Sequence, residues 1–132
     1  MKYLLVFVRD QETMYEGGNE EQFKAAMEAW NDFNREAIDA GALIANEALE
    51  LPRTAKTVRF GDDDLTVTDG PFAETKEQLG GFCLLDCENL DEAIEWAKKV
   101  PTGPGGVIEV RAVKDLSPYG YVNVTPDPDR QH

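Results

Sequence analysis

The N-terminal segment Lys2–Arg9 is apolar at both odd and even positions, and this pattern constrains the fold more than any other. Successive side chains of a β-strand point to opposite faces of its sheet. Such a strand turns Tyr3 and Phe7 to one face and Leu4 and Val8 to the other. Since both faces are apolar, the segment predicts a central strand in a sheet that is covered on both sides.

Two helices are predicted from caps and apolar stripes. The first begins after Asn19, with Gln22 completing a capping box, and ends at Gly41. The second begins after Asn89, with Glu92 in the matching position. The first stripe consists of Phe23, Ala26, Met27, Trp30, Phe33, Ala37 and Ile38, and the second of Leu90, Ala93, Ile94 and Ala97.

The remaining strands are predicted at Leu43–Leu49, Thr57–Phe60, Leu65–Thr68, Gly81–Asp86 and Val107–Val113. The second and third of these flank a Gly-Asp-Asp-Asp turn and form a hairpin. The order is therefore βαβ, hairpin, βαβ. Right-handed crossovers place both helices on one face of an antiparallel sheet, which is a ferredoxin-like α+β fold. We expect one domain over residues 1–114 and an extended tail over residues 115–132.

Two helices cover only one face of such a sheet, so the other face needs a second cover. The favoured cover is a second copy of the sheet in a two-fold homodimer. The alternative is the C-terminal tail with Tyr119, Tyr121 and Val122, and the two covers are compatible.

Charge and cysteine content narrow the class of protein. The 132 residues carry 26 acidic and 13 basic side chains, for a net charge of −13. Such a chain repels phosphate backbones and anionic lipid, so neither nucleic acid nor a membrane is an expected partner. The sequence has no spanning segment and no leader pattern, and its two cysteines, Cys83 and Cys87, suit a reducing cytoplasm.

The least generic stretch runs from Asp69-Gly70-Pro71-Phe72 to Phe82. Gly70 and Pro71 are turn residues, and Asp69 has two interpretations: a carboxylate that accepts backbone hydrogen bonds, or a general base. Gly80-Gly81 indicates either a β-bulge or a close approach of a ligand to the backbone.

Charged residues on the second sheet face are candidates for a pocket in which Glu47, Arg59, Glu109 and Arg111 converge, although structural ion pairs explain them equally well. The only histidine is His132, so we expect no histidine-based triad, no metal and no cofactor. Asp69 is the candidate catalytic residue, and the candidate ligand-binding residues are Glu47, Arg59, Glu74, Gly80, Gly81, Glu109 and Arg111.

These residues resemble the YCII-related superfamily, in particular its D-G-P-F subgroup, over roughly residues 1–113. The resemblance is carried by Asp69-Gly70-Pro71-Phe72, Glu74, Lys76-Glu77, Gly80-Gly81-Phe82, Leu90-Asp91-Glu92-Ala93 and Glu109-Val110-Arg111, and by the segment from Ala48-Leu49 to Pro52. It implies a dimeric α+β barrel. Certain members carry a His-Asp pair proposed to be catalytic, and this chain has no internal histidine to supply it. Some members are encoded beside extracytoplasmic-function sigma factors.

The resulting functional hypothesis is a cytoplasmic homodimer with a small-molecule pocket between sheet and partner. As an enzyme it would use Asp69 as acid or base, with an arginine holding an anionic group, in a cofactor-free step. The alternative is a non-catalytic metabolite-binding or regulatory module associated with sigma-factor systems, and a purely structural dimer is the third. The sequence leaves enzyme and binder open.

Overall fold

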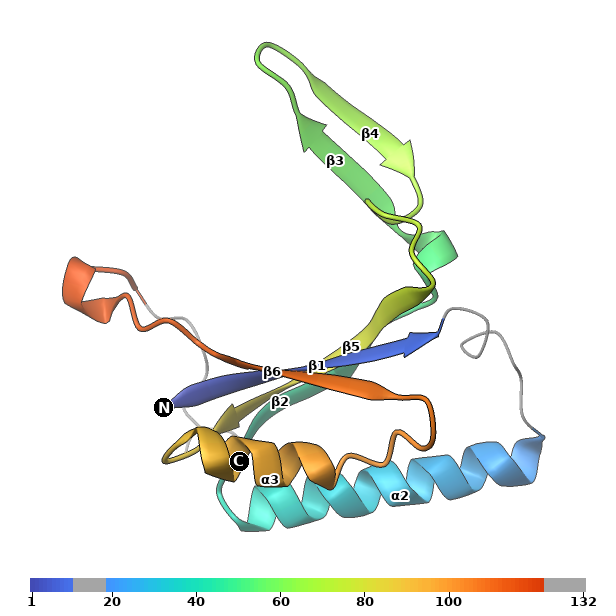
Figure 1. The fold of residues 1–132 in the computed structure, drawn as a ribbon, viewed down its shortest axis with the longest axis vertical. Coiled ribbons are helices and arrows are strands. Elements are labelled where there is room, and N and C mark those ends of the chain that lie inside the picture. The colour runs from blue at the N-terminus through green and yellow to red at the C-terminus, as the bar shows by residue number, and fades with distance from the viewer. Residues whose placement is uncertain (11–18, 123–132) are drawn as a thin grey trace.

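The protein has an α+β fold, shown in Figure 1. The computed structural model describes residues 1–10 and 19–122. Their elements follow in chain order: β1 Lys2–Asp10, α2 Glu20–Asp39, β2 Leu43–Ala48, η1 Pro52–Thr54, β3 Lys56–Phe60, β4 Leu65–Asp69, β5 Glu77–Asp86, α3 Leu90–Lys98, β6 Val107–Ala112 and η2 Ser117–Tyr119. The predicted βαβ, hairpin, βαβ order is confirmed.

Four strands form an antiparallel sheet in the order β2-β5-β1-β6. Strand β1 is central, as the pattern of Lys2–Arg9 predicts, and β5 is the other central strand. Strand β6, in which the partly buried Ile108 and Val110 alternate with exposed residues, lies at an edge. Both helices lie on the same side of this sheet (Figure 1).

The hairpin does not join this sheet. Within the described residues, strands β3 and β4 pair with each other and with no other strand, and Val58 lies opposite Val67 and Phe60 opposite Leu65. Figure 1 shows the hairpin rising from one end of the sheet, on the side away from the helices. It is therefore an arm attached to the body of the protein through its base.

Helix α2 begins and ends where its caps predict. Asn19 and Gln22 form the reciprocal capping box, and Gly41, with φ of 72°, follows the C-cap. Its predicted stripe is buried only in part, and the N-terminal end of the 20-residue helix extends past α3 (Figure 1). Within it Phe33 and Ala37 are buried, whereas Phe23, Met27 and Ile38 are exposed.

The core lies between the helices and the sheet and contains a row of four aromatic rings. Phe7, Trp30, Phe33 and Trp96 follow one another with ring centroids 5.3, 6.1 and 6.1 Å apart. The two last contacts are edge-to-face, an arrangement that stabilises beyond the buried area alone. Trp96, which the predicted stripe of α3 omitted, joins α3 to α2 through Phe33.

The opposite face of the sheet has no cover from the described part of the chain. In the C-terminal segment, Tyr119, Tyr121 and Val122 are all exposed, and η2 projects away from the sheet (Figure 1). Residues 113–122 therefore do not supply the second cover. The division into a domain over residues 1–114 and a tail over residues 115–132 stays a prediction, and residues 123–132 lie outside the described part.

Both cysteines are buried and free. Burial, which disfavours the thiolate, is the main cause that raises the pKa of Cys83 to about 12 and that of Cys87 to about 11. Such thiols are unreactive packing groups.

We expect the free energy of unfolding to fall as the pH rises from about 9 toward 11. Unfolded thiols release their protons near pH 8.5, whereas the native thiols keep theirs, so alkaline pH favours the unfolded state. Urea titrations at neutral and alkaline pH measure the decrease. A variant with Cys83→Ala and Cys87→Ala should show a smaller decrease; a loss as large as that of the wild type would contradict the assignment.

Candidate functional site

The Asp69-Gly70-Pro71-Phe72 segment lies at the base of the hairpin, where the chain leaves β4 and returns toward the sheet. Gly70 has a φ of 90°, which other residues rarely adopt. Its amide donates a hydrogen bond to the Ala55 carbonyl at 2.7 Å, and its carbonyl accepts one from Thr57 Oγ1 at 2.8 Å. The amide and the carbonyl of Gly70 therefore hold the turn against the start of β3 and the residue before it.

The rest of the loop is anchored by two long side chains. Arg59 Nη2 donates to the Phe72 carbonyl at 3.1 Å. Gln78, which is only 9% exposed, donates through Nε2 to the carbonyls of Ala73 and Thr75, both at 3.0 Å. A buried amide that satisfies two loop carbonyls gives the segment a defined conformation. Side-chain hydrogen bonds to its carbonyl groups thus stabilise the conformation of the loop that follows β4.

A pocket of about 550 Å³ opens beside this turn, between the base of the hairpin and the sheet. Its lining is mainly apolar, and Lys56 is the only basic side chain that the described residues contribute to it. The lining residues are Leu49, Glu50, Leu51, Pro52, Thr54, Ala55, Lys56, Thr57, Val58, Pro71, Phe72, Gln78 and Leu79. This volume and lining suit a small molecule with an apolar body.

Asp69 is not among the lining residues, but it contacts one of them. Its carboxylate forms an ion pair with Lys56 Nζ, and its side chain is 87% exposed. Carboxylates that act as general bases usually lie in sites that bury them. The position of Asp69 therefore suits a group that orients Lys56 at the pocket better than an acid–base catalyst.

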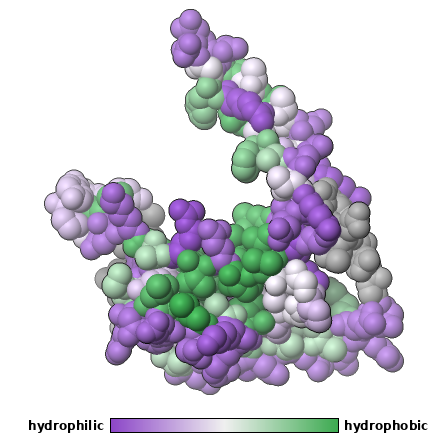
Figure 2. All heavy atoms as spheres, viewed as in Figure 1, coloured by the Kyte–Doolittle hydropathy of each residue, from purple (hydrophilic) through white to green (hydrophobic). Residues whose placement is uncertain are grey.

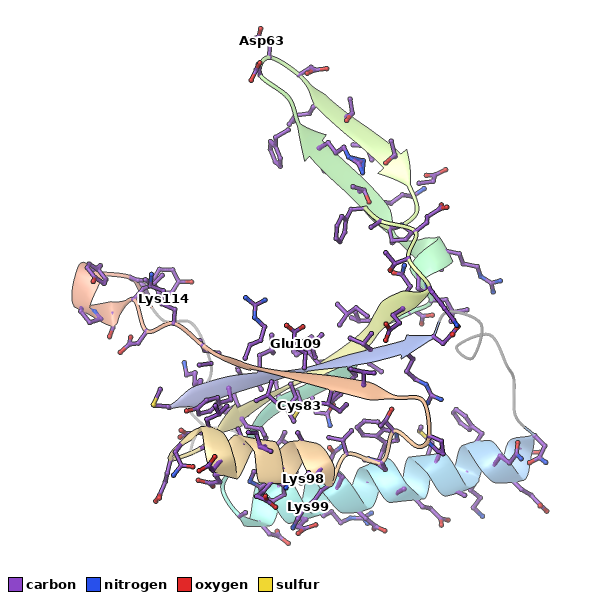
Figure 3. All side chains as sticks on the ribbon, viewed as in Figure 1. Asp63, Cys83, Lys98, Lys99, Glu109 and Lys114 are labelled. Atoms are coloured by element: carbon purple, nitrogen blue, oxygen red, sulfur yellow. The ribbon has the colours of Figure 1, made fainter. Side chains whose placement is uncertain are left out.

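A second candidate surface is the uncovered face of the sheet. Leu4 and Val6 of β1 lie on it, beside Leu84 and Phe82 of β5. On β6, Arg111 lies opposite Leu4, and Glu109 lies opposite Val6. Figure 3 shows Glu109 on the side of the sheet away from the helices. The uncovered face is therefore an apolar surface that has one acidic and one basic residue along its β6 edge.

Glu47 shares this face but lies at the other edge. It sits on β2 opposite Phe82, whereas Glu109 and Arg111 belong to β6. The two edge strands are three strand spacings apart, roughly 14 Å. Within one chain the fold does not bring Glu47 to Glu109 and Arg111, and Arg59 lies apart from all three in the hairpin.

The remaining candidates lie in β5 and in the loop before it. Glu74 is exposed in the loop before β5. Gly80 is the unpaired residue of a β-bulge, because Phe7 pairs with Gly81 and Val8 with Leu79. A Cβ on Gly81 would lie 2.7 Å from the Glu47 carbonyl oxygen, so this glycine serves the close approach of two strands.

Sequence reasoning missed most of the pocket. Lys56, Gln78 and Leu79 were not among the candidates, and Pro52 entered only through the family resemblance. The signal available for Gln78 was a polar residue at the entry of a strand that is apolar on both faces. Nothing in the sequence marked Lys56, since its role depends on the pairing of β3 with β4.

Other chemistry finds no support in the described part of the chain. No group of three or more His, Cys, Asp or Glu side chains in residues 1–10 and 19–122 could hold a metal ion. Over the same residues, no helix has the length and apolar character that crossing a membrane requires. His132 lies outside the described residues.

The comparisons with known proteins agree with one another. The family model of the YCII-related domain matches residues 1–117. An uncharacterised protein of Rhizobium meliloti (strain 1021) is 34% identical over 120 residues, which is 89% of this chain and 96% of that protein. Membership of the D-G-P-F subgroup stays a prediction from residues 69–72. The chain belongs to the YCII-related domain family.

Proposed function

We propose that the chain is a homodimeric protein that binds a small molecule in the pocket beside the Asp69-Gly70-Pro71-Phe72 turn. The pocket itself is the observation that supports this most directly: about 550 Å³, lined mainly by apolar side chains, with the Lys56 ammonium at its wall. A ligand with an apolar body and a polar or anionic group would match both features.

The uncovered sheet face supports the homodimer. Leu4, Val6 and Val8 of β1 are only partly buried within one chain, and the described tail does not cover them. Figure 2 shows hydrophobic residues gathered over the sheet in the hollow below the hairpin. A second copy would remove this surface from water, and Glu109 and Arg111 would then compensate each other's charge inside the interface.

Binding without turnover is favoured over catalysis because Asp69 is exposed and paired with Lys56. An acid–base enzyme remains the second candidate, supported by the contact of this ion pair with the pocket wall. In that case Asp69 would move a proton on a ligand that Lys56 holds. A role beside a sigma factor has no structural feature that supports it.

The test is a thermal-shift screen of the full chain against aromatic and aliphatic metabolites, with and without carboxylates. A ligand at one hundred times its Kd should add about 2.7 kcal/mol and raise Tm by several degrees. Leu49→Asp, in the pocket wall, should abolish the shift. Leu90→Asp, equally exposed on α3 (49% against 45%), should leave it intact.

Two further results decide between the candidates. If Asp69→Asn keeps the ligand-induced shift and the wild type forms no product, the protein is a binder. If the wild type converts the ligand and Asp69→Asn binds it without conversion, the protein is an enzyme. Stabilisation that survives Leu49→Asp would place the ligand elsewhere and overturn the pocket assignment.

A further inference from the structure

The β3–β4 hairpin exposes one apolar face that no described residue of its own chain covers. The cross-strand pairs Val58–Val67 and Phe60–Leu65 share this face, since residues directly opposite each other in a ladder point the same way. Their exposed fractions lie between 50% and 82%. A two-stranded hairpin is marginally stable in water unless it packs on something else. This arm therefore needs a partner surface.

The apolar face of the arm continues into the uncovered face of the sheet. Val58 lines the pocket together with Leu79. Leu79 in turn pairs with Val8, which lies on the uncovered face of β1. The arm and the sheet thus bound one hollow on the side away from the helices, and Figure 2 shows hydrophobic residues over the sheet and along part of the arm.

The charges at the two ends of this hollow are opposite in sign. The turn of the arm carries Asp62, Asp63 and Asp64. The far end of the sheet, at the C-terminal end of β6, carries Arg111 and Lys114. Figure 3 shows Asp63 at the tip of the arm and Lys114 beside the other end of the sheet, both on the side away from the helices.

Two acidic groups at that far end have partners within the chain. The Asp86 carboxylate pairs with the Met1 ammonium at 3.2 Å. Asp115 accepts hydrogen bonds from the amide and hydroxyl of Ser117 at 2.9 and 2.7 Å. Asp115 keeps its negative charge in these hydrogen bonds, and Arg111 shares its sheet face with Glu109. Lys114 is therefore the side chain whose positive charge this end offers to a neighbour.

A two-fold axis that crosses the strands reverses the ends of the sheet. It brings the acidic tip of each arm to the basic end of the other copy, and it does so twice because an isologous interface repeats every contact. The net charge of −13 makes two copies repel each other in general. Attraction between the acidic tip of each copy and the basic end of the other offsets that repulsion. It also favours this two-fold arrangement over one in which like ends of the two sheets meet.

We propose that the hairpin is an arm that embraces a second copy of this chain. Its apolar face of Val58, Phe60, Leu65 and Val67 packs on the partner, and its acidic tip lies at the partner's Lys114 end. The inference rests on the homodimer proposed above and adds to it: the arm carries the dimer contact, and the partner closes the hollow into which the pocket opens.

The first experiment measures the dimer Kd of the full chain by sedimentation equilibrium. Phe60→Asp places a charge in the middle of the proposed contact and should raise Kd at least about 30-fold, as the loss of a central apolar anchor does. Thr66→Asp adds the same charge on the other face of the same hairpin and should change Kd less than about threefold. Far-ultraviolet circular dichroism checks that both variants fold.

The second experiment tests the placement of the tip by charge reversal. Asp63→Lys and Lys114→Glu should each raise Kd roughly fivefold, the size expected for exposed charge pairs. The double variant should return to within about twofold of the wild type, because the pair is restored with its signs exchanged. Additive losses in the double variant would overturn the placement of the tip.

The outcomes distinguish the proposed role of the hairpin from the proposed homodimer. A monomeric wild type overturns both. A wild-type dimer whose Kd is unchanged by Phe60→Asp leaves the homodimer standing and overturns the arm. A dimer weakened equally by Phe60→Asp and Thr66→Asp also overturns it, since the effect would then come from added charge alone and not from the apolar face.

Discussion

Phe33→Ala should destabilise the protein by about 4 kcal/mol, a large part of the total stability of a domain of this size. Phe33 is 4% exposed and lies between Trp30 and Trp96, with ring centroids 6.1 Å away on either side. Removing its ring leaves a cavity between α2, α3 and the sheet that stiff aromatic neighbours cannot fill. It also breaks two edge-to-face contacts at once.

Two measurements follow the effect. Urea unfolding gives the loss of stability, and Tm should fall by at least about 10 °C. Trp30 and Trp96 are the only tryptophans and both flank the deleted ring, so native emission should shift to the red as water reaches them. Phe23→Ala is the matched control on the same helix, since Phe23 is 65% exposed, and it should cost less than about 0.5 kcal/mol. Equal costs for the two substitutions would mean that α2 does not pack through Phe33.

The parts of the fold that could be predicted are those that local chemistry decides. Caps at Asn19 and Asn89 and the glycine after α2 mark helix ends because they satisfy backbone groups a few residues away. Parity also succeeds: a strand apolar on both faces has to be central, and β1 and β5 are. Parity does not say which strands are neighbours, and the order β2-β5-β1-β6 is known only from the structure.

Prediction failed where a contact depends on geometry beyond the neighbouring turn. Apolar spacing marked Phe23 and Met27 as core positions, but spacing says nothing of how far a helix extends past its sheet. Trp96 shows the converse error, a core residue that the predicted stripe omits. Helix α3 is short, and the apolar spacing chosen for it passes through Leu90, Ala93, Ile94 and Ala97. In the same way, the alternation of β3 and β4 predicts a hairpin without saying what covers its apolar face.

The candidate site shows the same division. Parity assigned Glu47, Glu109 and Arg111 correctly to one face, since each lies opposite a residue of the uncovered face. Whether these three side chains also lie close together depends on the order of the strands. That order puts β2, with Glu47, and β6, with Glu109 and Arg111, at opposite edges of the sheet. The pocket depends on still longer contacts: Gln78 reaches back to a loop, and Lys56 meets Asp69 only because two strands pair.

Gly81→Val should strongly destabilise the sheet. A Cβ at this position would lie 2.7 Å from the Glu47 carbonyl oxygen and 3.2 Å from the Phe7 ring. The nearest obstacle is backbone, which cannot rotate away as a side chain does, so β2 and β5 would have to separate where they meet the pocket. Overpacking of this kind costs about 3 kcal/mol.

The graded series Gly81→Ala and Gly81→Val tests this cause, with urea unfolding as the measurement. The loss should increase from alanine to valine, although valine is the better strand former. Glu47→Ala removes only an exposed side chain and leaves the carbonyl in place, so it should change stability little by itself and should not rescue Gly81→Ala. Rescue by Glu47→Ala would show that the side chain, and not the main chain of β2, requires a glycine at this position.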